Sequence, residues 1–297
     1  MATSLDIFVP YWGDPDYMKL TVNSVLAQSD PRWLLTVIDD AYPDPTVENY
    51  VSGLADSRIT YVKKPSNQGI TANFRTSVQL ASQDLLAVVG CDDILLPNYV
   101  ATMLAAHAEY PEADIIQPGV QVIDADGAPA RTAVDTVKQK LLRPRSSVPL
   151  LLSGEPLAVS LLHGDWLYWP SLAFKTASIR AVDFRDEFPI IQDLALVIDM
   201  ILEGRSLLVV PAKSFAYRRH AKSASSALII GGTRFSGERE YFALAAELSR
   251  ARGWRRAENA ARLRLTSRAH ALSLLPALVM GRNTRGVRHM IRHGLGA

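Results

Sequence analysis

The chain has 297 residues, of which 48% are hydrophobic, and its formal net charge is +2. This length suits one large domain or two modest ones, the composition excludes a disordered chain, and the small charge gives no whole-chain argument for nucleic-acid binding. The lone Cys91 cannot form an internal disulfide, so we expect a cytoplasmic protein. No stretch reaches the roughly 18 unbroken apolar residues of a membrane span, so any contact with a membrane is expected at its surface.

The chain begins with a short apolar strand and a turn. Residues 5–9 are apolar, and Pro10-Tyr11-Trp12-Gly13 follows them. Tyr11 or Trp12 could stack on a nucleotide base at this edge of the sheet, although aromatic residues at a strand end also pack in cores. Asp14-Pro15 is typical of a helix start, and the apolar spacing after it predicts the first helix.

The next two strands are followed by polar segments. Residues 33–38 are predicted as a strand that ends in Asp39-Asp40, and residues 58–62 as a strand that precedes Asn67-Gln68-Gly69. A helix is expected over 71–81, with Asn73 and Arg75 in its first turns. These two side chains could face a ligand crevice, or they could be ordinary solvated helix residues.

The most informative stretch is the apolar run 85–89, which leads through Gly90-Cys91 into Asp92-Asp93. Continuous apolar character suits a parallel strand covered on both faces, and ligands bind beyond the carboxyl ends of such strands. Two adjacent carboxylates repel each other unless a cation neutralises them, which favours a divalent-metal site for a nucleotide diphosphate. The alternative is that the pair caps the helix predicted from Pro97 to Tyr110.

The strand and helix alternation continues to about residue 125, with further strands at 115–117 and 120–123 and a turn at 124–127. The pattern predicts an α/β fold, a βαβ-wound and mainly parallel sheet flanked by helices. We expect residues 1–125 to form a nucleotide-sugar-binding half and 126–234 an acceptor-binding and catalytic half of the same domain. Residues 235–297 are predicted as a basic helical extension.

The second half carries three further candidate segments. Trp166, Tyr168 and Trp169 could stack on an acceptor sugar or pack in the core. Asp193 could be a helix cap or a general base at the mouth of a pocket. Arg218-Arg219-His220 follows a strand predicted at 207–210, and a histidine in such a basic loop could meet a metal or a phosphate.

The extension from residue 235 is rich in arginine, and beside Leu272–Met280 its arginines suit an interfacial helix on anionic lipid. Its last arginines, Arg282, Arg285, Arg288 and Arg292, have no acid among them. A solvated helix with its apolar side on the core is the leading alternative, and nucleic-acid binding is the weaker third.

The order of these motifs resembles the family 2 inverting glycosyltransferases with the GT-A fold. The resemblance covers roughly residues 4–226 and rests on six segments: Val9–Gly13, Asp39-Asp40, Asn67-Gln68-Gly69 with Asn73, Gly90–Asp93, Gln192-Asp193, and Arg218–His220 with Ser223–Ser226. Two segments depart from it. Gly90 stands where many members carry another aspartate, and Ala41–Asp44 replaces the usual glycine-serine turn.

The resemblance implies a metal-dependent inverting glycosyltransferase that uses Mg²⁺ or Mn²⁺ and a nucleotide-sugar donor, with UDP the expected nucleotide. It assigns catalysis to Asp193, the metal to Asp93 and His220, and phosphate binding to Arg218 and Arg219. Nucleotide binding is assigned to Pro10, Tyr11, Trp12, Asp39, Asp40, Asn67, Asn73 and Asp92, and acceptor binding to Trp166, Tyr168 and Trp169.

The expected acceptor is a carbohydrate or a lipid-linked molecule in cell-surface polysaccharide or glycolipid synthesis. The basic extension suggests peripheral contact with an anionic membrane at its inner face, and a homo-oligomer stays open. Two rivals remain at this point: a non-catalytic nucleotide-sugar or carbohydrate-binding protein, and a nucleotidyltransferase, which would also use paired acids and a metal.

Overall fold

A computed structural model of the chain describes residues 4–220 and 233–273, together with residues 275, 287, 290, 291 and 294. Its described residues form one nine-stranded sheet with the order β3-β2-β1-β4-β8-β6-β9-β5, and β7 pairs with β9 beside this path. The strands are β1 Leu5–Tyr11, β2 Trp33–Asp39, β3 Ile59–Lys63, β4 Leu85–Val88, β5 Ile94–Leu95, β6 Ile115–Ile123, β7 Leu150–Leu152, β8 Ala173–Lys175 and β9 Leu207–Arg218.

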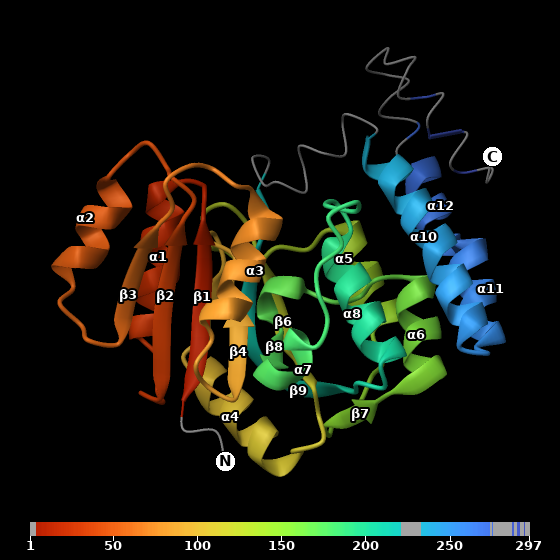
Figure 1. Ribbon diagram of the computed structural model, residues 1–297, viewed down its shortest axis with the longest axis horizontal. Coiled ribbons are helices and arrows are strands. Elements are labelled where there is room, and N and C mark those ends of the chain that lie inside the picture. The colour runs from red at the N-terminus through yellow and green to blue at the C-terminus, as the bar shows by residue number, and fades with distance from the viewer. Residues whose placement is uncertain are drawn as a thin grey trace.

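Helices cover both faces of this sheet (Figure 1). They are α1 Pro15–Leu26, α2 Thr46–Gly53, α3 Ile70–Leu80, α4 Tyr99–Glu109, α5 Ala133–Val137, α6 Gly154–His163, α7 Thr176–Arg180, α8 Gln192–Leu202, α10 Thr233–Ala251, α11 Arg255–Leu263 and α12 Leu265–Ser273. A π-helical turn, η1 (Lys138–Leu142), and a 3₁₀ turn, η2 (Trp169–Ser171), complete the described elements.

The first strands are apolar because they are buried on both faces. All seven residues of β1 and all four of β4 are buried. Within β4, Leu85 and Ala87 pack on the side of α1 and α4, whereas Leu86 and Val88 pack on the side of α6 and α8. This two-sided core is why the strands read as continuous apolar runs rather than as alternating patterns.

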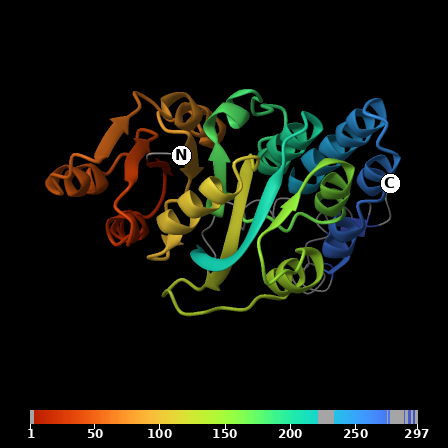
Figure 2. The ribbon, with the colours of Figure 1, turned by 90° about the horizontal axis from the view of Figure 1, so that it is seen from below.

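The pairing confirms the predicted wound, mainly parallel sheet. Strand β1 pairs in parallel with both β2 and β4, β2 pairs in parallel with β3, and β6 pairs in parallel with β9. The strands β5, β7 and β8 pair antiparallel with their neighbours. Figure 2 shows β6 in yellow and β9 in teal running side by side through the middle of the sheet.

Two predictions for the second half of the sheet were wrong. Residues 115–123 form one strand rather than two, because the register shifts around Gly119 keep the pairing with β9 continuous past Pro118. Strand β9 is 12 residues long, far beyond the predicted residues 207–210, because residues 213–218 pair with the second half of β6. The two predicted halves therefore share one sheet.

The predicted helical extension begins as α10, and Figure 1 shows α10 and α11 at the right, beside α6 and α8. Tyr241, Phe242 and Ala257 belong to the same core cluster as α6 and α8. The predicted interfacial residues Leu274, Leu278, Val279 and Met280, and Arg282, Arg285, Arg288 and Arg292, lie outside the described residues. In the described part of the chain, every helix is too short or too polar to cross a bilayer.

Candidate functional site

The candidate site lies at the carboxyl edge of the parallel strands. The last residue of β1, Tyr11, is in register with Asp39 of β2, and the Asp40 N–H donates to the Tyr11 carbonyl over 3.2 Å. The segment that links β3 to α3 reaches the same edge, at the top of Figure 1. Its Gly69 caps α3 with a φ of 83°, a conformation that favours glycine.

The first acidic pair is buried and holds two loops at the carboxyl edge of the sheet. Asp39 accepts from the Tyr42 N–H and the Tyr61 hydroxyl, each over 2.7 Å. Asp40 accepts from the N–H groups of Gln68 and Gly69, over 2.9 and 2.8 Å. Every one of the four carboxylate oxygens thus has a protein partner. These acids organise the turn after β2 and the loop before α3, and base contacts by Asp39 and Asp40 stay a prediction.

The turn after Asp40 is strained. Ala41 has a φ of 63°, which is the left-handed region where an alanine side chain is disfavoured. This is the position at which the sequence departs from the family's glycine-serine turn. The Asp39 carboxylate offsets the strain by holding the Tyr42 N–H.

The second acidic pair meets the end of β9, more than a hundred residues later in the chain. Asp93 Oδ1 accepts from the Arg218 N–H over 2.8 Å, and Asp92 Oδ2 lies 2.8 Å from Nε2 of His220. Three of the residues assigned to ribose and metal binding, Asp92, Asp93 and His220, are therefore neighbours. The alternative in which the pair caps the following helix does not hold, because Asn98 precedes α4 at its N-terminus.

Asp93 has the features of a cation ligand. Its carboxylate is buried, and Oδ2 has no hydrogen-bond partner among the described residues. Burial, and to a lesser degree the charge of Asp92, raises the pKa of Asp93 well above the usual carboxyl value. The hydrogen bond from the Arg218 N–H acts in the opposite direction and lowers it. A buried carboxylate oxygen without a partner is costly unless a proton or a cation satisfies it.

At Gly90, where many members of the resembled family carry another aspartate, the structure has no room for a side chain. A Cβ atom at this position would lie 2.6 Å from Oδ2 of Asp93 and 3.0 Å from Oδ1 of Asp92. A side chain here would displace the carboxylates from their present positions. The glycine therefore leaves room for the two acids to face the same space.

Asp93 and His220 could hold a divalent cation only if a bound diphosphate and water supplied the remaining ligands. Within 4–220 and the described part of the extension, no group of three or more His, Cys, Asp or Glu side chains is placed to hold a metal. Asp93 and His220 would supply two protein ligands, and diphosphate oxygens and water would complete an oxygen-rich shell.

The two arginines assigned to phosphate binding are engaged with the protein. The Arg218 guanidinium donates to the carbonyls of Asp92, Asp124 and Ala125 and lies over the Tyr17 ring. Arg219 forms an ion pair with Asp135, whose Oδ1 lies 2.8 Å from Nη2. Both guanidinium groups fasten the 124–135 segment to the end of β9, and phosphate binding by Arg218 and Arg219 stays a prediction.

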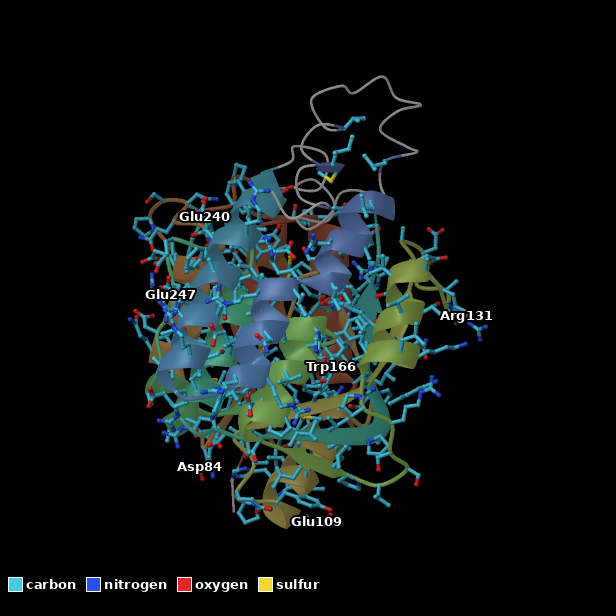
Figure 3. The ribbon with its side chains drawn as sticks, turned by 90° about the vertical axis from the view of Figure 1, so that its right-hand side faces the viewer. Asp84, Glu109, Arg131, Trp166, Glu240 and Glu247 are labelled. Carbon is cyan, nitrogen blue, oxygen red and sulfur yellow. The ribbon has the colours of Figure 1, made fainter. Side chains whose placement is uncertain are left out.

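The aromatic predictions divide by burial. Trp12 is 52% exposed, whereas Tyr11 is fully buried, so only Trp12 could stack on a base. The prediction that three aromatic residues form an exposed platform for the acceptor was wrong. These residues are at most 8% exposed and belong to the two core clusters: Trp166, Tyr168 and Trp169. Figure 3 shows Trp166 within the molecule, whereas Arg131 projects from its surface.

The remaining predicted residues surround α3. Pro10 is buried within β1, and Asn67 Oδ1 accepts from the Gly69 N–H over 3.1 Å. Asn73 is buried, and its Oδ1 has no hydrogen-bond partner among the described residues. Arg75 does not face the crevice, since it forms ion pairs with Asp183 and Asp186.

The structure also identifies Lys64, which sequence reasoning missed. Its ammonium group is buried 4.0 Å from Asp40 Oδ1, without a hydrogen bond to the described residues, and burial lowers its pKa. The only signal in the sequence is a lysine that directly follows a strand, and that pattern is common on surfaces.

Asp193 is the second residue of α8 and is partly exposed. Its neighbour Gln192 accepts from the Thr71 hydroxyl over 2.6 Å, which ties the start of α8 to the start of α3. Since Gly69 at the start of α3 is bound to Asp40, the segments that carry Asp40 and Asp193 border the same helix end. Ser223–Ser226, the last part of the resemblance, lie outside the described residues.

A family model described as glycosyl transferase family 2 matches residues 6–151. Among curated proteins, the colanic acid biosynthesis glycosyl transferase WcaA of Escherichia coli is 28% identical over 102 residues, which cover 34% of this chain and 37% of that protein. The uncharacterized glycosyltransferase RC0461 of Rickettsia conorii is 26% identical over 198 residues, which cover 65% of this chain and 30% of the relative. The chain thus spans about a third of the length of these relatives.

Among solved structures, residues 1–349 of TarS from S. aureus, in complex with UDP-GlcNAc, superpose with a TM-score of 0.64. The superposition covers 99% of this chain and 92% of the TarS chain, at 12% sequence identity. At this level of identity the likeness establishes the fold of the sheet and its flanking helices.

Proposed function

The chain belongs to glycosyl transferase family 2 and has the GT-A fold, and from this premise we propose that it transfers a sugar from a nucleotide diphosphate donor to an acceptor hydroxyl with inversion. The observation that carries the proposal is the meeting of Asp92, Asp93 and His220 at the sheet edge where the exposed Trp12 also lies. A carboxylate pair with an unpartnered buried oxygen suits a cation-bound diphosphate better than it suits a folded core.

The donor would lie across the carboxyl edge of the sheet. The Trp12 ring offers an exposed face for the base, and Asp92, whose side chain is 28% exposed, is placed to accept from a ribose hydroxyl. Asp93 and His220 would hold Mg²⁺ or Mn²⁺. When bound, the cation supplies positive charge next to the departing diphosphate. UDP sugars are the first donors to test, because TarS of the same fold is crystallised with UDP-GlcNAc.

Asp193 would act as the general base. It would take the proton of the acceptor hydroxyl while the acceptor oxygen bonds to the anomeric carbon, and the bond to the diphosphate would break on the opposite face. The hydrogen bond from Thr71 to Gln192 would fix the direction of the Asp193 backbone relative to the donor site. The acceptor is proposed to be a carbohydrate or a lipid-linked molecule of cell-surface polysaccharide or glycolipid synthesis, in line with the name of the colanic acid relative.

The test is substitution of the proposed base. Asp193→Asn should lower turnover by about 10² to 10⁴, the usual contribution of a general base, while UDP affinity measured by titration calorimetry stays unchanged. Asp84→Asn, an exposed acid that precedes the first residue of β4 at the opposite edge of the sheet, serves as the control that should keep full turnover. Turnover is measured as nucleotide release from a panel of UDP, GDP, CDP and dTDP sugars with Mn²⁺, both by transfer to added carbohydrate or lipid-linked acceptors and by hydrolysis of the donor to water.

The two rivals give different results in this assay. Full turnover in Asp193→Asn would remove that residue from the mechanism. A wild-type protein that binds donors but releases no nucleotide would be the non-catalytic binding protein. Release of pyrophosphate from a nucleoside triphosphate would identify a nucleotidyltransferase.

A further inference from the structure

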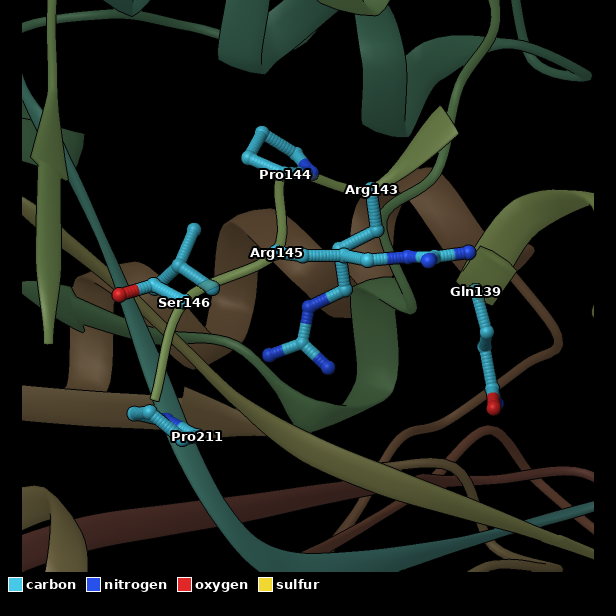
Figure 4. Close-up of a pocket in the computed structure, with 7 residues that line it drawn as sticks. Gln139, Arg143, Pro144, Arg145, Ser146 and Pro211 are labelled. Atoms are coloured by element: carbon cyan, nitrogen blue, oxygen red, sulfur yellow. The ribbon is translucent and has the colours of Figure 1, made fainter. Parts of the chain in front are cut away.

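A cavity of about 190 Å³ lies against β9, away from the donor site. It is bounded by the segment that follows η1 and by the middle of β9 (Figure 4). Its lining residues are Gln139, Arg143, Pro144, Arg145, Ser146, Val209 and Pro211. None of them belongs to the proposed donor site, and the lining contains two arginines and no carboxylate.

Arg143 is a preorganised cation in this cavity. Its Nη2 donates to the carbonyls of Pro118 and Val210, each over 3.2 Å, which fixes the guanidinium plane. Its Nε is buried and has no hydrogen-bond partner among the described residues. Burial lowers the pKa of Arg143, and only the Tyr168 hydroxyl opposes this effect. The guanidinium thus has a free donor and no compensating acid.

Arg145 adds a second cation from the same short segment. It is exposed, and its guanidinium donates to the Lys140 carbonyl. No ion pair among the described residues includes Arg143 or Arg145. Figure 4 shows the side chains of Arg143 and Arg145 close together among the residues that line the cavity. Arginine forks match the oxygens of phosphate groups, and a site with two of them and no acid selects an anion.

The chain segment that contributes the two arginines also carries exposed apolar side chains. Leu141 is 75% exposed and Val148 is 63% exposed, and they stand on either side of Arg143 and Arg145 in the chain. Val134 and Val137 of α5 are also exposed. Residues 131–148 contain five basic residues and one acid, Asp135, which pairs with Arg219, and Lys138 of this segment pairs with Asp165. Exposed apolar side chains beside unpaired cations are typical of surfaces that contact anionic lipid.

We propose that this cavity binds the phosphate group of an anionic lipid headgroup, and that Leu141 and Val148 enter the bilayer interface beside it. The surface from Val134 to Val148 would then dock the protein on the membrane. This contact is separate from the basic extension and does not depend on the glycosyl transfer reaction. Two phosphate sources share this chemistry, free phosphate and the lipid headgroup, and the experiment below separates them.

The test is cosedimentation of the full chain with vesicles. Wild-type protein should sediment with phosphatidylcholine vesicles that contain phosphatidylglycerol and stay in solution with pure phosphatidylcholine. Arg145→Gln should reduce the bound fraction roughly tenfold, and Leu141→Ser should reduce it severalfold. Arg145 is exposed, and within the part of the chain that the structure describes its guanidinium hydrogen-bonds only to the Lys140 carbonyl, so its variant should fold normally, and thermal unfolding checks this. Arg143→Gln is the second variant.

The matched control is Arg131→Gln, an exposed arginine of the same segment outside the cavity. It removes the same charge and should change vesicle binding less than twofold. An equal loss in Arg131→Gln and Arg145→Gln would overturn the site, because diffuse attraction would then explain the binding. Unchanged binding in Arg145→Gln and Arg143→Gln would also overturn it, since the basic extension is intact in every variant.

Inorganic phosphate separates the two sources. Free phosphate should displace wild-type protein from the vesicles and should raise its Tm, but should not raise the Tm of Arg145→Gln. A phosphate-dependent Tm without any vesicle binding would overturn the lipid assignment and identify a site for a soluble phosphate.

Discussion

At the scale of single residues, three buried polar side chains at the candidate site lack hydrogen-bond partners among the described residues. Asp93 Oδ2, Lys64 Nζ and Asn73 Oδ1 are buried polar atoms without hydrogen bonds among the described residues. Lys64 and Asn73 lie on either side of the loop that Asp40 holds, and Asp93 lies on the loop after β4. Such atoms also occur elsewhere among the described residues, so it is the position of these three along one sheet edge that supports the proposed donor site.

Asp93→Asn tests the cation role directly. The amide oxygen of the substituted side chain would keep the hydrogen bond from the Arg218 N–H, and the variant would lose the negative charge and the unpartnered Oδ2, in whose place an NH2 group would stand. We expect UDP to bind the wild type more tightly with Mn²⁺ than without it, and the variant to bind UDP equally in both conditions. Calorimetric titration measures both affinities, and an undiminished effect of Mn²⁺ in the variant would disprove the metal role of Asp93.

His107 should make the stability depend on pH outside the site. Burial, followed by the nearby Lys175, lowers the pKa of His107 below its ordinary value of 6.5. The folded protein therefore binds fewer protons than the unfolded chain in this range. The His107 contribution to the free energy of unfolding should be fully present above pH 6.5 and should be lost as the pH falls through the lowered pKa.

Urea unfolding of wild type and His107→Gln, from about pH 7.5 to about pH 5, measures this contribution. The wild type should lose more stability than the variant over that interval. Parallel pH profiles for the two proteins would contradict the prediction.

Local sequence could predict the acidic pairs but not the partners of the arginines. Asp39-Asp40 and Asp92-Asp93 follow buried apolar runs, and a buried strand fixes which edge its last residues reach. Arg218 and Arg219 were expected to meet phosphate, yet their acceptors come from residues 92 to 135, which only the tertiary fold brings near. The burial of Trp166 likewise depends on α6 and α8, because aromatic residues serve cores and sugar sites equally well.

At the scale of elements, the pairing of β6 with β9 depends on a close approach of backbones. A Cβ atom on Gly119 would lie 2.7 Å from the Pro211 carbonyl oxygen and 2.9 Å from the Ala212 carbonyl oxygen. The β6 strand shifts register at this point, next to a proline that cannot donate a hydrogen bond. The sequence pattern therefore suggested two short strands, although the bulge joins them into one.

Gly119→Ala should destabilise the protein by about 1–3 kcal/mol, because the neighbouring atoms belong to the backbone and cannot rotate away. Gly53→Ala is the control, since nothing lies within 4 Å of a Cβ atom there. Its stability should change by less than about 0.5 kcal/mol. Urea midpoints measure the stability of both variants. An equal shift in the two would contradict the prediction and would show that the backbone of β9 moves away from the added methyl group.

At the scale of the molecule, the strands of residues 4–125 and those of residues 126–220 form one sheet. Strand β8, from residues 173–175, lies between β4 and β6, and β5 pairs only with β9 among the described strands. The helices α10 and α11 then join the core of the second half. The sequence pattern could predict that these strands exist. It could not predict that β8 lies between β4 and β6, because a three-residue strand carries no pattern that specifies its neighbours.

A fragment of residues 1–125 should therefore not fold by itself. Without β8 and β9, β5 and β6 have no partner in the described sheet, and one side of the first strands lacks its cover from α6 and α8. We expect the fragment to lack a cooperative urea transition, whereas the whole chain shows one. A sharp transition and well-dispersed NMR signals from the fragment would mean that the first half is an independent domain.

The hydrogen bond from the Arg218 N–H to Asp93 also bears on how the protein matures during synthesis. The two residues are 125 positions apart, so a ribosome that adds about 5–20 amino acids per second would expose Asp93 many seconds before its partner emerges. During that interval the carboxylate has no N–H donor from β9, and the nascent chain should have no competent donor pocket. Activity would then appear late in translation, which keeps an unfinished polypeptide from consuming activated sugars.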